Sequence, residues 1–269
     1  MPASPFDVIY GALGKSPTLR RVFETAYGVD YASDAEPFGY VTAGELRRVR
    51  DAIGVGAGDS VVDLGCGRGG PGLAVVAPTG ASLVGVDLSS VAIGEARRRA
   101  EALGVSERVR YVVADLRDTG LPAGAYAAVL SFDAFQIVPE PRRTLAEVSR
   151  LLVPGGWLAF TTWEANPQVP VPEAIEARIV RDYRPLLESA GFVVELIEEP
   201  AGWLERQLAV YRGIVAERAA LVHELGEAPA SMILEEAVGE PERLALGRAR
   251  RVFVLARRAA ASSTPRGAG

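Results

Sequence analysis

Acidic residues stand at the ends of three short apolar runs in the first half of the chain. Asp63 lies two residues before the first glycine of the stretch Asp63-Leu64-Gly65-Cys66-Gly67-Arg68-Gly69-Gly70, Asp87 lies 20 residues after Gly67, and Asp115 ends the next run. Carboxylates accept hydrogen bonds from amino groups and hydroxyls. In open parallel sheets, ligands bind at the carboxyl ends of the strands. The three acids therefore predict one binding site at that edge.

The glycine stretch predicts a loop that lets the backbone approach a ligand closely and turns helix N–H groups toward it. Nicotinamide and flavin sites use a similar loop, but there it must accept a pyrophosphate, which a desolvated carboxylate such as Asp63 would repel by roughly several kcal/mol. S-adenosylmethionine carries a cationic amino group and a sulfonium and no phosphate, so Asp63 favours that ligand over NAD. Asp87 is placed to accept both ribose hydroxyls, and Asp115 to accept from the adenine amino group. Each acid alone could equally be a helix N-cap or a solvated loop residue.

Short β-branched apolar runs alternate with longer helical patterns, which is typical of βαβ units and a parallel sheet. Helices are predicted over 70–77, over 89–103 with Ser89 as N-cap, and over 141–152, followed by the turn Pro154-Gly155-Gly156. The predicted strands are 60–64, 82–86, 109–113, 127–132, 157–162, 192–197 and 251–256.

These motifs resemble those of class I S-adenosylmethionine-dependent methyltransferases. The resemblance runs from about Val49 to Trp163 and includes Ser131-Phe132-Asp133 and Leu151-Leu152-Val153-Pro154-Gly155-Gly156. It implies an α/β, Rossmann-like seven-stranded sheet, mostly parallel with the last strand antiparallel, flanked by helices and covered by a helical lid from the N-terminus and a late insertion. The cofactor-binding residues that it implies are Tyr40, Asp63, Gly65, Cys66, Gly67, Asp87, Leu88, Asp115, Leu116, Ser131 and Phe132.

The chain divides into four predicted parts. Residues 1–48 form an N-terminal helical lid segment, 49–163 the cofactor-binding core, 164–258 the rest of the core with a helical cap at about 201–247, and 259–269 a disordered tail. Within the lid segment, Phe38-Gly39-Tyr40 is similar to the His-x-Gly-Tyr-Trp element of sterol, tocopherol and sugar methyltransferases. Pro37 and Val41 replace the His and Trp of that element, so only Tyr40 is carried over.

The residues after the fourth and fifth strands face the transferred methyl group in this family. They provide Asp133 and Glu164 as candidate bases and Gln136 and Trp163 as candidate acceptor contacts, with Tyr27 added from the aromatic lid segment. His223, the only histidine, is a third candidate base because imidazole titrates near pH 7. It lies off the apolar stripe of a helix predicted over 203–225. Each of the three has an ordinary alternative as a solvated, exposed or capping side chain, and methyl transfer does not always need a base.

Composition narrows the class of substrate and partner. A net charge of -5 and a pI near 5.2 provide no basic field for a nucleic acid, and an aromatic lid with few charges suits a largely apolar small molecule. The single cysteine, Cys66, allows no internal disulfide; it is interpreted as a small loop residue, not a nucleophile. With no metal cluster, signal peptide or long apolar run, we expect no metal, no membrane and a cytoplasmic monomer or homodimer.

The arginine-rich, lysine-poor composition is typical of a high-GC bacterium. The leading hypothesis is a small-molecule methyltransferase of natural-product biosynthesis, such as antibiotic biosynthesis, that methylates an O, N or C atom. Two alternatives stay open: cyclisation or another non-methylating reaction on the same fold, and a non-catalytic protein that binds S-adenosylmethionine.

Overall fold

The computed structural model describes residues 5–13, 16–36, 39–168, 170, 179–245 and 249–260, without the side chains of residues 5, 6, 12, 13 and 240–245. Parts of the predicted lid segment 1–48 and most of the predicted tail 259–269 lie outside these ranges. None of the helices in the described part of the chain is long and apolar enough to cross a membrane.

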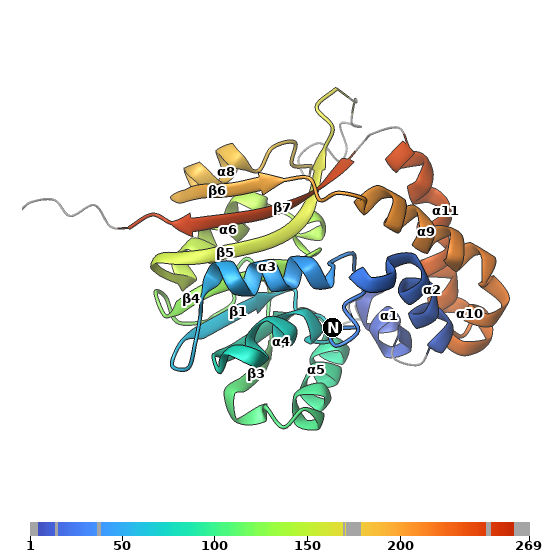
Figure 1. Ribbon diagram of the computed structural model, residues 1–269, viewed down its shortest axis with the longest axis horizontal. Coiled ribbons are helices and arrows are strands. Elements are labelled where there is room, and N and C mark those ends of the chain that lie inside the picture. Colours follow the sequence, from blue (N-terminus) through green and yellow to red (C-terminus); the bar gives the residue numbers. More distant parts are fainter. Residues whose placement is uncertain are drawn as a thin grey trace, which may run out of the picture.

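A seven-stranded sheet forms the centre of the molecule (Figure 1). Its strand order is β3-β2-β1-β4-β5-β7-β6; β1 to β5 pair in parallel, and β7 runs antiparallel to both β5 and β6. The predicted Rossmann-like sheet with an antiparallel last strand is confirmed. The strands are β1 Ser60–Leu64, β2 Ser82–Asp87, β3 Val109–Val113, β4 Tyr126–Phe132, β5 Leu152–Ala165, β6 Phe192–Glu198 and β7 Ala249–Arg258.

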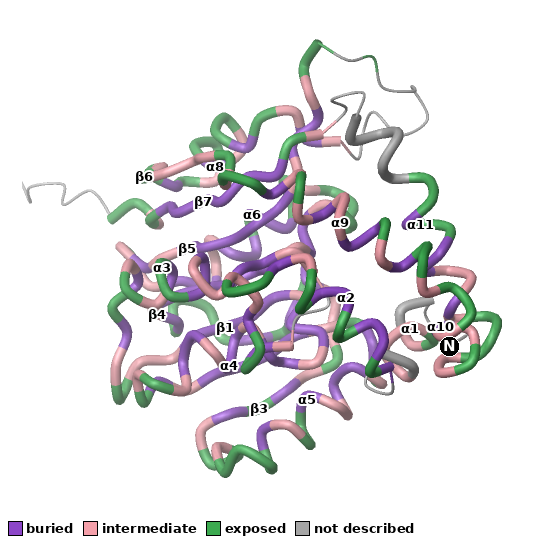
Figure 2. The backbone as a smooth tube through the Cα atoms, turned by 45° about the vertical axis from the view of Figure 1, so that its right-hand side comes forward, coloured by how far each residue is buried: buried purple, intermediate pink, exposed green. Residues whose placement is uncertain are grey.

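Helices cover both faces of the sheet, which explains why its strands read as continuous apolar runs. Neighbouring side chains in β1 face opposite ways: Val61 packs in one buried cluster with α3, α4 and α5, and Val62 in a second with α6 and α8. The central strands are accordingly buried along their length (Figure 2). The covering helices are α3 Ala43–Ile53, α4 Gly70–Val76, α5 Ser90–Ala102, α6 Pro141–Leu151 and α8 Arg184–Ser189.

The remaining helices form a third packed group, which we call the helical cap. It comprises α1 Pro5–Leu13, α2 Pro17–Tyr27, α9 Trp203–Ala216, α10 Arg218–Leu225 and α11 Glu227–Ala245. Figure 1 shows α1 and α2, from the start of the chain, beside α9 to α11 from its end. Glu224 joins the two parts because it accepts hydrogen bonds from the Ser16 and Thr18 hydroxyls at 2.6 Å each.

Two local predictions were wrong. The turn expected at Pro154-Gly155-Gly156 lies within the long strand β5. Gly155 adopts φ 77° there, and the pairing of β4 with β5 shifts register beside it, so the chain passes the glycines as a bulge. The helix expected over 203–225 is two helices, because Glu217 leaves helical geometry between α9 and α10.

Candidate cofactor and acceptor site

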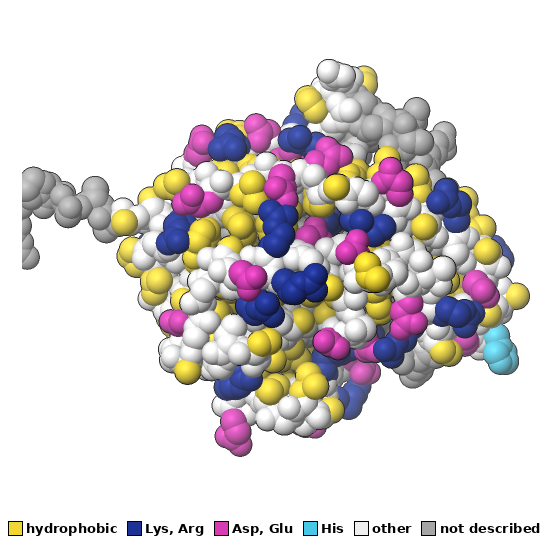
Figure 3. All heavy atoms as spheres, in the orientation of Figure 1, with side chains coloured by type: hydrophobic (Ala, Val, Ile, Leu, Met, Phe, Trp, Pro, Cys, Tyr) yellow, Lys and Arg dark blue, Asp and Glu magenta, His cyan; other side chains and the backbone are white. Residues whose placement is uncertain are grey.

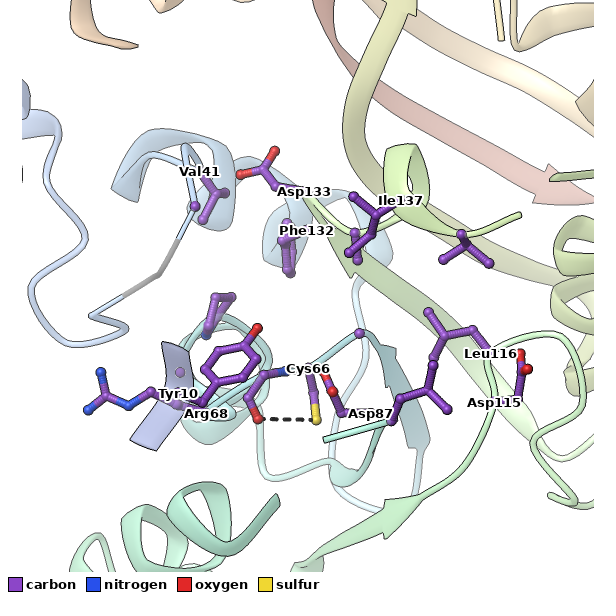
Figure 4. Close-up of a pocket in the computed structure, with 18 of the residues that line it drawn as sticks. Tyr10, Val41, Cys66, Arg68, Asp87, Asp115, Leu116, Phe132, Asp133 and Ile137 are labelled. Carbon is purple, nitrogen blue, oxygen red and sulfur yellow. Dashed lines mark hydrogen bonds between the residues drawn. The ribbon is translucent and has the colours of Figure 1, made fainter. Parts of the chain in front are cut away.

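A cavity opens at the carboxyl ends of the parallel strands (Figure 4). The loops after β1, β2, β3 and β4 line it, together with Tyr10 of α1 and with Glu36, Gly39 and Val41. Its lining residues are Tyr10, Glu36, Gly39, Val41, Gly65, Cys66, Gly67, Arg68, Gly70, Pro71, Asp87, Leu88, Asp115, Leu116, Arg117, Phe132, Asp133, Ala134, Ile137, Val138 and Pro139.

The glycine loop is held against the neighbouring strand by its own backbone. The N–H groups of Gly65 and Cys66 donate to the carbonyl of Val86 at 2.8 and 3.1 Å. Gly65 has φ 73°, and a Cβ there would stand 2.4 Å from the Cβ of Ala134. Both the left-handed conformation and the close approach require glycine at this position.

Asp63 lies beneath the glycine loop and not among the side chains that line the cavity. It is 1% exposed, and neither carboxylate oxygen accepts a hydrogen bond of ordinary geometry. Burial, followed by the charge of Asp87, raises its pKa to about 7, and only the Gly72 N–H lowers that value. A buried carboxylate without a partner is costly, and its field favours a cationic ligand in the cavity above it.

Asp87 ends β2 on the cavity wall. Its oxygens accept hydrogen bonds from the N–H groups of Gly67 and Ser89, both at 2.9 Å. Burial raises its pKa. Each carboxylate oxygen can accept a second bond, so the fixed carboxylate suits a ligand with two hydroxyls. Leu88, next to it on the wall, is 59% exposed and offers apolar surface for a flat ring.

Asp115, after β3, is held by an arginine. Arg117 Nη2 and Nε donate to its carboxylate at 2.7 and 3.0 Å, and the Arg117 backbone N–H donates at 2.8 Å. The side-chain hydrogen bonds from Arg117 lower the pKa of Asp115. The predicted adenine-side acid is therefore an oriented ion pair on the cavity wall, beside the buried side chain of Leu116.

Comparison with known proteins agrees with this geometry. Residues 62–160 match the model of a methyltransferase domain family. Sterol 24-C-methyltransferase ERG6B of Gibberella zeae is 32% identical over 111 residues, which cover 41% of this chain and 29% of that protein. The chain thus spans about a third of the length of this curated relative.

Two solved structures share the architecture. A geranyl diphosphate methyltransferase in complex with GPP and sinefungin is 26% identical, with a TM-score of 0.61 over 81% of this chain and 79% of that one. The [4+2]-cyclase SpnF is 21% identical, with a TM-score of 0.67 over 80% and 81% of the two chains. The chain carries a class I, S-adenosylmethionine-dependent methyltransferase domain.

The candidate base Asp133 of this methyltransferase domain belongs to a buried charge network. It follows β4 with φ 54°, unusual for a residue other than glycine. Its carboxylate accepts hydrogen bonds from the Tyr40 N–H at 2.6 Å and the Thr161 hydroxyl at 2.8 Å, and pairs with Arg251 at 3.2 Å. Arg251 is fully buried and also pairs with Glu45 at 2.5 Å. This arrangement suits a residue that fixes the covering segment 39–42.

The other two candidate bases lie away from the cavity. Glu164 is fully buried, accepts from the Tyr183 N–H at 2.6 Å and pairs with Arg250 at 2.7 Å. His223 is exposed on α10, where Figure 3 shows the one cyan side chain at the outer edge of the molecule. Neither residue lines the cavity, so the geometry gives no support to the predicted roles of Glu164 and His223.

Tyr40 turns toward the helical cap. Its ring meets Trp163 edge-to-face at 5.4 Å, and its hydroxyl donates to the Tyr211 hydroxyl at 2.8 Å. The Tyr27 hydroxyl donates to the Tyr40 carbonyl at 3.4 Å. Burial raises the pKa of Tyr40 and Tyr27. The predicted contacts Tyr40, Trp163 and Tyr27 thus form one aromatic group beneath the cap, whereas Gly39 and Val41 line the cavity.

Three further predicted contacts have distinct positions. Phe132 lines the cavity, whereas Ser131 is fully buried behind it and donates to the Leu64 carbonyl at 2.8 Å. Gln136 donates to the Asp133 carbonyl and accepts from Thr162. Both polar side chains thus fix the backbone behind the cavity wall. Cys66 lines the cavity, and burial raises the pKa of its thiol, which does not favour a nucleophile.

The sequence interpretation missed Tyr10, Arg68, Glu36 and the apolar run at 137–139. Tyr10 reaches over the loop from α1: a Cβ on Gly67 would stand 2.9 Å from its hydroxyl oxygen. An excess of aromatics in the lid segment was visible, but nothing in the sequence indicated which of them would face the cavity. Within the described ranges, no group of three or more His, Cys, Asp and Glu side chains could hold a metal ion; that the protein uses no metal stays a prediction.

Proposed function

We propose that this protein transfers the methyl group of S-adenosylmethionine to an O, N or C atom of a largely apolar small molecule in bacterial natural-product biosynthesis, antibiotic biosynthesis included. The observation that carries the proposal is the division of the cavity into two walls. Asp87 and Asp115 stand on one wall, and Val41, Phe132 and Ile137 stand on the other (Figure 4).

The acidic wall holds the cofactor in this proposal. Asp87 accepts from the ribose hydroxyls, and the Asp115 ion pair with Leu116 and Leu88 brackets the adenine. Gly65 and Gly67 leave room for the backbone to follow the ligand closely. S-adenosylmethionine supplies an electrophilic methyl group on a sulfonium, and the negative field of Asp63 and Asp87 stabilises that cationic end.

The apolar wall orients the acceptor. Val41, Phe132, Ile137, Val138 and Pro139 exclude water and offer hydrophobic contact. The Asp133 carboxylate, engaged by two donors and an arginine, positions the cover over this wall. Alignment of the acceptor atom with methyl and sulfur can contribute roughly 7–11 kcal/mol to the rate. The similarity to a sterol 24-C-methyltransferase and to a geranyl diphosphate methyltransferase supports an apolar acceptor, because the sterol skeleton and the geranyl chain are hydrocarbon.

A second candidate function keeps the cofactor fold and catalyses cyclisation. The structural similarity to the [4+2]-cyclase SpnF supports it, because an apolar, water-excluding cavity also suits a reaction that folds an acceptor on itself. A non-catalytic protein that binds S-adenosylmethionine is the third reading. In all three cases we propose a monomer or homodimer in the bacterial cytoplasm, where a lone thiol stays reduced.

The decisive experiment adds purified protein and methyl-labelled S-adenosylmethionine to a metabolite extract of the source organism. A labelled product together with S-adenosylhomocysteine supports methyl transfer. Consumption of an extract component without S-adenosylhomocysteine supports cyclisation, and bound cofactor that is never turned over supports the non-catalytic reading. Asp87→Ala serves as the control: it should weaken cofactor binding roughly 10- to 100-fold because it leaves the ribose hydroxyls unpaired.

A further inference from the structure

Charged side chains are spread along the cavity, with a cation at one end and a carboxylate at the other. Figure 4 shows Arg68 at one end, Asp115 at the other, and Cys66 and Asp87 between them. In the proposed function, Asp115 lies at the adenine and Asp87 at the ribose. The end of the cavity at Arg68 is therefore next to the remaining part of the cofactor. That part is an α-amino acid, which carries an ammonium and a carboxylate.

Arg68 has binding capacity that its neighbours do not use. Its Nε is buried without a hydrogen-bond partner, and its nearest recorded carboxylate oxygen, Glu36 Oε2, stands 4.0 Å from Nη2. Glu36 is already engaged by Arg20 at 2.6 Å and Arg99 at 2.7 Å. Among the described residues, the Glu36 carboxylate is thus shared by three guanidinium groups, and Arg68 is the most distant of the three.

The pKa of Arg68 agrees with this incomplete pairing. Burial, followed by the charge of Arg99, lowers the pKa of Arg68, and the charges of Glu36 and Glu95 offset only part of that effect. Within the described part of the chain, Arg68 forms an ion pair with neither Asp63, under the glycine loop, nor Asp87, beside it. The cation and Asp87 therefore stand apart on the cavity lining, with Asp63 buried beneath the loop, an arrangement that complements a zwitterion.

We infer that Arg68 binds the carboxylate of the amino-acid end of the cofactor, while the field of Asp63 and Asp87 holds its ammonium. The inference rests on the proposed function. A guanidinium presents its donors in a fork that matches a carboxylate. Glu36 positions the side chain without neutralising it. The pair of charges sets the direction in which the amino-acid end lies, and hence where the sulfur and methyl point.

The test measures how much the ligand's carboxylate contributes to binding, apart from the rest of the ligand. Calorimetric titration compares S-adenosylhomocysteine with S-adenosyl-3-thiopropylamine, which keeps the amino group and lacks only the carboxylate. The variants are Arg68→Met, Arg68→Lys and the matched control Arg98→Met, which removes an arginine that is 65% exposed on α5. Thermal unfolding of each variant checks that the fold is intact.

Arg68→Met should weaken S-adenosylhomocysteine binding roughly 10- to 100-fold and change the affinity for the amine analogue less than about 3-fold. Arg68→Lys should lie between wild type and Arg68→Met, and Arg98→Met should match wild type. Equal weakening of both ligands by Arg68→Met, or weakening of neither, would overturn the inference. Wild-type protein that binds neither ligand would instead contradict the proposed function, and the Arg68 assignment with it.

Discussion

Replacing Asp63 by asparagine should stabilise the ligand-free protein and do so in a pH-dependent way. Asp63 has a pKa of about 7 in the fold against an ordinary value of 3.8. Because the folded-state pKa is raised, the stability that this group contributes is fully present below pH 3.8 and is lost as the pH rises through about 7. The carboxylate is 1% exposed, so water does not screen the cost.

The magnitude follows from the difference of the two values. A shift from 3.8 to about 7 corresponds to about 4 kcal/mol at about 1.4 kcal/mol per pH unit. Asparagine removes this cost but buries an amide without partners, which costs about 1–3 kcal/mol at every pH. At pH 8 the variant should therefore be more stable by about 1–3 kcal/mol. The gap should widen by about 2.3 kcal/mol between pH 5 and pH 7, independent of the amide term.

Urea unfolding of wild type and Asp63→Asn at half-unit steps from pH 5 to pH 8 measures this gap directly. Asp51→Asn is the matched control, because the side chain of Asp51 is 71% exposed and its loss should change stability little at any pH. The variant should also bind S-adenosylhomocysteine more weakly than wild type, since the cationic amino group loses its buried counter-charge. A free-energy gap that stays constant or narrows as the pH rises would refute the reasoning.

Three shorter predictions follow from the same geometry. Arg251→Met should lower the free energy of unfolding by about 3–5 kcal/mol in urea titrations, because it removes the counter-charge of two buried carboxylates; a loss below about 1 kcal/mol would contradict the network. Gly65→Ala should abolish measurable cofactor binding in calorimetry, because the new Cβ meets Ala134 at 2.4 Å; wild-type affinity would show that the loop is not rigid. His223→Ala should change kcat less than about 2-fold, since the imidazole is exposed outside the cavity; a 100-fold loss would restore it as a base.

Most of the fold could be predicted from the sequence because the strands of its sheet are buried on both faces. Such strands leave apolar runs that stand out from the helices between them, and all seven overlap the ranges predicted for them, although β5 is much longer than predicted. The antiparallel pairing of β7 was implied only by the family resemblance. The irregularities within elements were not predicted. The chain forms a bulge at Gly155 within β5, and Glu217 separates α9 from α10.

The cofactor wall was more predictable than the acceptor wall for a related reason. Asp87 and Asp115 sit at strand ends, where the parallel topology fixes their place whatever their rotamers. The roles expected of Asp133 and Glu164 depended on side-chain direction, and that direction is set by Arg251 and Arg250 on β7, more than 80 residues later in the chain. Sequence spacing carries no information about such partners.

These long-range pairs also bear on how the proposed reaction would be catalysed. Arg251 joins Glu45, at the start of α3, to Asp133, at the end of β4, and Asp133 in turn holds the Tyr40 N–H of the covering segment. A base must release lone pairs to accept a proton, and releasing Asp133 would leave Arg251 with a buried, half-paired charge. The same bonds make the cover rigid over the apolar wall, which is what alignment of an acceptor requires. The network therefore favours an acceptor atom that is already nucleophilic when it binds. An acceptor that the protein must first deprotonate is less favoured.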